Sequence, residues 1–60
     1  MEELKSYLET IIALTTKHIA EDEAIKDNDP KLREFYRGSL AIEKNDLVVF
    51  KKLMDMVNKL

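Results

Sequence analysis

The stretch Asp27-Asn28-Asp29-Pro30 separates two long segments of helical pattern. Asp29 is a good N-cap, because its carboxylate can accept a backbone N–H from the first turn of the next helix. Pro30 then falls at the first helical position, where its missing N–H costs nothing. Proline also disfavours helical geometry in the residue before it, and Asn28 tolerates the left-handed conformation that closes many helices. The stretch therefore predicts a tight turn between two antiparallel helices.

Outward from this turn we expect one domain over residues 1–60. The first helix should cover residues 2–27, the turn residues 27–30 and the second helix residues 30–60. The predicted fold class is all-α, an antiparallel helical hairpin. Gly38-Ser39 could break the second helix. That leaves open a three-helix alternative with a short helix over residues 30–37.

Size and composition point to a protein that associates with itself. A chain of 60 residues buries only about 60% of its unfolded surface and is marginally stable alone. The absence of cysteine excludes disulfides and thiolate metal sites. No apolar run approaches the roughly 18 residues of a membrane span, and the acidic start Met1-Glu2-Glu3 argues against a signal peptide. We expect a cytoplasmic oligomer with no membrane association.

The first segment carries an apolar stripe about 160° wide at helical spacing, which is more than one partner helix covers. Its members are Leu4, Tyr7, Leu8, Ile11, Leu14, Thr15, His18, Ile19 and Ile25, with Ile12 at the edge. Acids near the end of this segment do not suit the negative end of a helix dipole. The nearest basic residues that could compensate them are Lys31, Arg33 and Arg37.

The second segment contains a heptad pattern, in which positions alternate three and four apart. The pattern runs through Tyr36, Ser39, Glu43, Asp46, Phe50, Leu53, Val57 and Leu60, flanked by Leu32, Phe35, Ile42, Leu47, Val49 and Met54. Val48 and Met56 point away from the hairpin partner. One antiparallel helix cannot cover this much apolar surface, and surplus of that size usually marks an interface.

We therefore predict a homodimer in which two hairpins form a four-helix bundle. A groove for the helix of another protein is the alternative. The residues expected at the interface are Leu4, Leu8, Ile11, Ile12, Phe35, Tyr36, Leu47, Val48, Phe50, Leu53, Met54 and Val57.

The two halves of the chain carry opposite charge. Residues 1–29 hold three lysines and eight acids, a net charge of −5, whereas residues 30–60 hold seven basic residues and four acids, a net charge of +3. Opposite charge favours pairing of the two helices within a hairpin, and also antiparallel pairing between chains.

Several polar residues interrupt the apolar positions. Folding the chain at residue 29 places them within about three helical turns of one another on facing surfaces. We expect a buried polar layer made of His18, Asp22, Tyr36, Glu43 and Asp46. In this layer Tyr36 would donate to Asp22, and His18 would pair with Glu43 or Asp46, because buried charges are costly unless paired.

The same residues offer a metal-site alternative. Helical bundles build metal sites from carboxylates and histidines three residues apart on facing helices. Here His18-x-x-Glu21 lies in the first segment and Glu43-x-x-Asp46 in the second. These paired motifs resemble those of the all-α nucleoside triphosphate pyrophosphatases. That resemblance implies carboxylates that hold magnesium or manganese for phosphohydrolysis. It covers four residues and departs from the family pattern at His18, where an acid is expected.

No other pattern indicates chemistry. The chain has one histidine and no glycine-rich elbow around Ser6 or Ser39, and we expect neither enzymatic activity nor a cofactor. Nucleic-acid binding is disfavoured by the net negative charge and by Glu34 and Asp55 among the basic residues of the second helix. The sequence therefore favours a small interaction or regulatory protein, with a second copy of itself as the first partner and a helix of another protein as the alternative.

Overall fold

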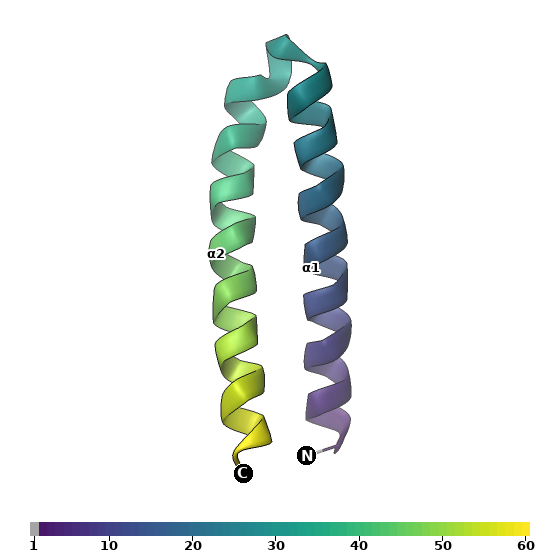
Figure 1. The fold of residues 1–60 in the computed structure, drawn as a ribbon, viewed down its shortest axis with the longest axis vertical. Coiled ribbons are helices and arrows are strands. Elements are labelled where there is room, and N and C mark those ends of the chain that lie inside the picture. Colours follow the sequence, from purple (N-terminus) through teal and green to yellow (C-terminus); the bar gives the residue numbers. More distant parts are fainter. Residues whose placement is uncertain (1) are drawn as a thin grey trace.

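A computed structural model describes residues 2–60, and Met1 of the expected domain lies outside the described residues. Helix α1 spans Glu2–Asn28, the short 3-10 helix η1 spans Pro30–Leu32, and helix α2 spans Arg33–Asn58. Figure 1 shows α1 and α2 side by side and antiparallel, with both ends of the chain at the end opposite the turn. The hairpin measures 45 × 15 × 10 Å, so it is a single layer of two helices. The predicted all-α hairpin is confirmed.

The turn works largely as its residue types predict. The Asp29 backbone is extended, with φ −131° and ψ 99°, as a residue before proline should be. Its Oδ1 accepts the Lys31 N–H at 3.0 Å, which satisfies one free donor of η1. Asn28 does not take the left-handed conformation, since no residue among 2–60 has a positive φ. It remains helical instead, and its side-chain Nδ2 donates to the Ala24 carbonyl at 2.8 Å.

The second helix differs from the expected range of residues 30–60 at both ends, since α2 ends at Asn58. Its first three residues form η1, in which the Leu32 N–H donates to the Asp29 carbonyl at 3.1 Å. The α-helix then continues without interruption through Gly38 and Ser39. The three-helix alternative is therefore wrong, because the helical hydrogen bonds on both sides outweigh the modest cost of one glycine.

Gly38 lies on an uncrowded part of the surface of α2, and a substitution there can test whether it is uncovered. A Cβ built at Gly38 meets no atom within 4 Å. We expect Gly38→Ala to stabilise the protein by about 0.5–1 kcal/mol, because alanine loses less backbone entropy in a helix. Urea unfolding followed by circular dichroism measures this change. A loss of stability would show that a second chain approaches the backbone at this position.

The contact between α1 and α2 is made by one stripe on each helix, which we call the inner stripes. Leu8 on α1 and Leu40 and Val57 on α2 are buried there, with exposed fractions of 6%, 3% and 8%. The remaining members are partly buried. They are Ile12, Thr15, Ile19 and Asp22 on α1 and Tyr36, Glu43, Leu47, Phe50 and Met54 on α2.

The observed stripe corrects the predicted heptad of α2. Every seventh residue agrees, as Tyr36, Glu43, Phe50 and Val57 do face α1. The alternate positions are each one residue later than predicted: Leu40, Leu47 and Met54 replace Ser39, Asp46 and Leu53. This choice places three apolar side chains against α1 where the predicted pattern placed one, and it leaves Asp46 in water, which is where a carboxylate costs least.

Leu40 is the most buried side chain of the hairpin. We expect Leu40→Ala to destabilise the fold by about 2–5 kcal/mol, through lost apolar burial and the cavity left behind. Val48→Ala is the control, because Val48 is 51% exposed and leaves no comparable cavity. Thermal unfolding at one fixed chain concentration compares the two. Equal effects would mean that the inner stripes do not form the core.

An ion pair links the helices directly. Lys44 Nζ lies 2.8 Å from Glu23 Oε1, and it lowers the pKa of the Glu23 carboxyl from its ordinary value of 4.5 by hydrogen bonding and by attraction. Both side chains are about half exposed, so the pair contributes little stability. Lys44 was not among the basic residues expected to compensate the acids of α1. In a helix, side chains lean towards the N-terminus, so Glu23 and Lys44 lean towards each other on antiparallel helices.

Candidate interaction surface

The hairpin leaves a second stripe uncovered on each helix. On α2 the positions again alternate four and three apart, and most side chains are strongly exposed: Phe35 68%, Ile42 67%, Val49 45%, Leu53 41% and Met56 64%. On α1 the corresponding residues are Leu4 44%, Tyr7 59%, Leu14 50% and Ile25 37%. The stripes also include Ile11 and His18 on α1 and Ser39 and Asp46 on α2. We call these two stripes together the open face.

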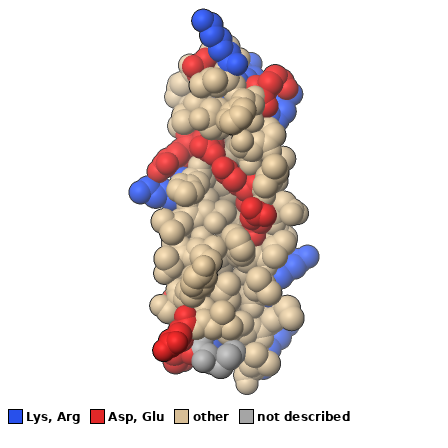
Figure 2. Space-filling model, turned by 180° about the vertical axis from the view of Figure 1, so that it is seen from behind, with Lys and Arg blue, Asp and Glu red and all other residues tan. Residues whose placement is uncertain are grey.

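Both stripes lie on the same side of the hairpin. On each helix the second stripe is displaced in the same rotational sense from the inner stripe, and in an antiparallel pair this brings both stripes to one broad face. Figure 2 views the hairpin from behind, onto this face. Uncharged side chains cover most of it, basic side chains lie at its margins, and acidic side chains cross its upper half, towards the turn.

A groove of about 370 Å³ runs between the two helices on this face. Its walls include Ile11, Leu14, Thr15 and His18 from α1 and Glu43, Asp46 and Phe50 from α2. The groove is therefore an apolar channel with a carboxylate-rich wall and one histidine. A groove of this kind has room for apolar side chains beside a positively charged or hydrogen-bond-donating group.

Glu43 has the most unusual environment in the groove. Its Oε2 atom is buried and has no hydrogen-bond partner. The pKa of the Glu43 carboxyl is raised above its ordinary value of 4.5. The largest cause is the neighbouring Asp22 carboxyl, to which protonated Glu43 can donate, followed by burial and by repulsion from Asp22. Asp46 adds repulsion, whereas attraction to His18 opposes the shift. A second carboxylate beside a partly buried one favours the neutral form.

The predicted polar layer is thus assembled differently from expectation. None of its five residues is buried by the hairpin itself, and His18 and Asp46 are exposed. Within residues 2–60, Tyr36 does not donate to Asp22, and His18 forms no ion pair with Glu43 or Asp46. The Tyr36 ring instead lies edge-on to Phe35, with ring centroids 5.1 Å apart. Burial of the layer stays a prediction about an assembly of chains.

The residues predicted at the interface divide into three groups. Leu4, Ile11, Phe35 and Leu53 lie on the open face. Leu8, Ile12, Tyr36, Leu47, Phe50, Met54 and Val57 belong to the inner stripes, where the hairpin covers them wholly or in part. Val48 lies on the opposite broad face, because it follows the inner residue Leu47 by 100° of helical rotation. The other residues of that face are polar residues and alanines.

The predicted interface omits six of the ten apolar residues of the open face. Tyr7, Leu14, Ile25, Ile42, Val49 and Met56 were not among the predicted interface residues. The signal was present, since Phe35, Ser39, Ile42, Asp46, Val49, Leu53 and Met56 form a second heptad pattern offset from the first. A helix with two such patterns has apolar residues on two adjacent sides, and one partner helix covers only one of them.

The residues of the metal-site alternative are only partly brought together. His18, Glu43 and Asp46 line the groove, but Glu21 does not. Its Oε1 lies 4.0 Å from Lys17 Nζ, one turn earlier on α1. In the part of the chain that the structure describes, no group of three or more His, Asp or Glu side chains is arranged to hold a metal ion.

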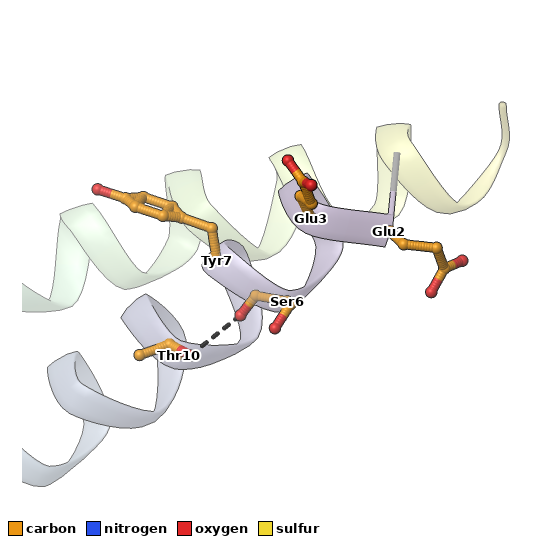
Figure 3. A pocket seen from close by; sticks show the side chains of 5 residues that line it. All are labelled: Glu2, Glu3, Ser6, Tyr7 and Thr10. Carbon is orange, nitrogen blue, oxygen red and sulfur yellow. Dashed lines mark hydrogen bonds between the residues drawn. The ribbon is translucent and has the colours of Figure 1, made fainter.

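A second hollow lies near the start of α1, and it has the character of ordinary surface. One helix alone lines it, through Glu2, Glu3, Ser6, Tyr7 and Thr10. Figure 3 shows that these side chains do not converge on a common point. The Thr10 hydroxyl is already occupied, because it donates to the Ser6 carbonyl at 3.0 Å.

Comparisons with known proteins found no match, so an inference about function rests on the geometry of the chain. No family model matches the chain, and no curated protein or solved structure matches it either. Among residues 2–60 no helix is long and apolar enough to cross a membrane.

The raised pKa of Glu43 predicts how stability depends on pH. Ionisation of Glu43 opposes folding, so this penalty is absent below its ordinary pKa of 4.5 and grows as pH rises through the raised value. Glu43→Gln removes the ionisable group. We expect the variant to unfold at a higher temperature than the parent at pH 7 and at nearly the same temperature at pH 4.

The control is Glu9→Gln, which makes the same change in net charge at an exposed position. Thermal unfolding by circular dichroism at both pH values measures the difference. A variant that is equally or less stable at pH 7 would contradict the unfavourable environment of Glu43.

Proposed function

We propose that this chain is a small non-enzymatic protein-interaction or regulatory module, which works as a homodimeric four-helix bundle formed through the open face. The observation that carries the proposal is the second heptad stripe on each helix. Both stripes lie on one side of the hairpin, and nine large apolar side chains in them are 37–68% exposed. An exposed apolar surface of this kind is typical of an interface.

The small core of the hairpin supports the same proposal. Only Leu8, Leu40 and Val57 are buried among the described residues. Domains below about 70–80 residues rarely obtain more than about 3–5 kcal/mol from their core and usually need a disulfide, a metal or a partner. The chain has no cysteine. A second copy supplies the missing apolar contact with no further component.

The spacing of the two stripes also fits a bundle. Each helix of a four-helix bundle touches two neighbours, so it needs two adjacent apolar stripes. The inner stripe of α2 faces α1, and its second stripe follows the same heptad spacing on the adjacent side. Heptad spacing produces the shallow crossing angles by which long helices stay in contact along their length.

The proposal predicts the mass of the particle in solution. Light scattering over a concentration series should give about twice the chain mass of 7.0 kDa. Ile42→Glu places a charge in the open face and should weaken dimerisation roughly 100-fold or more, since each tenfold loss requires about 1.4 kcal/mol.

Ala41→Glu is the matched control, because it places the same charge one residue away on the polar face. This variant should keep the dimer. A folded monomer in the parent chain would overturn self-association and leave the open face for a helix of another protein. A dimer mass for both variants would show that the dimer forms through another surface.

A further inference from the structure

Two copies can meet through the open face in two symmetric ways. If the two-fold axis runs parallel to the helices, both turns lie at the same end, and α1 of each copy packs against α2 of the other. If the axis runs across the helices, the turns lie at opposite ends, and each helix packs against its own equivalent. Both arrangements make all neighbouring helices antiparallel, so the apolar stripes alone do not choose between them.

We propose that the second copy docks with its turn at the same end, so that the acidic α1 of each chain lies against the basic α2 of the other. This inference rests on the proposed homodimer and adds its orientation. Three observations carry it: the charge of the two helices, the ends of the open face, and the polar groups of the groove.

The charge of the two halves favours the same-end arrangement. The half containing α1 carries −5 and the half containing α2 carries +3. The same-end dimer places the acidic half of each chain beside the more basic half of the other. The opposite-end dimer places −5 against −5 and +3 against +3. Complementary charge at an interface selects orientation and register, and like charge penalises the alternative.

The open end of the hairpin carries this complementarity in particular residues. Glu3 lies near the start of α1, and Lys59 lies just beyond the end of α2, so both stand at the end opposite the turn. In the same-end dimer the Glu3 of each chain comes level with the Lys59 of the other. In the opposite-end dimer it comes level with the turn, where the acidic Asp27 and Asp29 alternate with the basic Lys26 and Lys31, so Glu3 gains no comparable net attraction.

The groove favours the same orientation. Glu43 lies near the middle of the hairpin arm, with its buried Oε2 unpartnered and Asp22 and Asp46 close by. The opposite-end dimer would bring the Glu43 residues of the two chains to the same height on adjacent helices, whereas the same-end dimer keeps them on diagonally opposite helices. The same-end dimer instead places the partner's α1, which carries His18, along the α2 that carries Glu43 and Asp46. His18 and Asp46 then lie within about two helical turns in height.

Distances between spin labels test the orientation. Because the chain has no cysteine, Lys31→Cys in η1 gives one nitroxide per copy, and pulsed electron double resonance measures the distance between copies. The same-end dimer should give about 20–30 Å, two to three helix diameters. The opposite-end dimer should give a distance near the 45 Å length of the hairpin.

Asn45→Cys is the matched control, since it lies near mid-length and gives a short distance in either orientation. Short distances for both labels support the proposal. A short distance at residue 45 with a distance near 45 Å at residue 31 overturns the orientation and leaves the bundle standing. No dipolar signal at residue 45 overturns both the dimer and its orientation.

Discussion

Two helices lying side by side can cover only one stripe of each other, and most features of this protein follow from that limit. The Asp29-Pro30 turn forces α1 and α2 into an antiparallel pair, and their inner stripes bury Leu8, Leu40 and Val57. Each helix is nevertheless apolar over a much wider arc than its inner stripe. The remainder forms the open face, which no part of residues 2–60 covers.

The same limit on coverage affects the polar residues. Between the helices, Glu23 reaches Lys44, and the attraction stabilises its ionised form. In the groove, Glu43 meets Asp22 instead, and its own Oε2 has no partner. A group that is half covered loses water without gaining a hydrogen bond, so it opposes folding of the isolated hairpin. A partner chain that completed its surroundings would remove this penalty, in the way that paired polar residues specify register in coiled coils.

The fold could be predicted from the sequence because its signals are local. The N-cap and proline of the turn act within four residues, and the helical periodicity of each segment is long and nearly uninterrupted. The side of α2 that faces α1 was less predictable. Two heptad patterns overlap there, one through Leu40 and Leu47 and one through Ser39 and Asp46, and both contain apolar residues. Only packing against a partner helix decides between them, and that is a non-local property.

The contacts of the long polar side chains were the least predictable feature. Matching positions equidistant from the turn places Asp22 level with Tyr36, yet the carboxyl of Asp22 lies against Glu43. The lean of side chains towards each helix N-terminus explains this shift, as it does for Glu23 and Lys44. On antiparallel helices these leans converge, so a polar residue of α1 meets an α2 residue well beyond the one at its own height. Backbone register alone therefore misassigns such pairs.

The difference in charge between the two halves of the chain affects both the hairpin and the proposed bundle. Within one chain, the turn already places an acidic helix beside a basic one. The same-end dimer repeats this pairing between chains, so that acidic and basic helices alternate around the bundle and each helix has two neighbours of opposite charge. The opposite-end dimer would satisfy the charge of each helix on one side only. A single division of charge between the two halves can thus direct both the folding of the hairpin and the choice of how two hairpins meet.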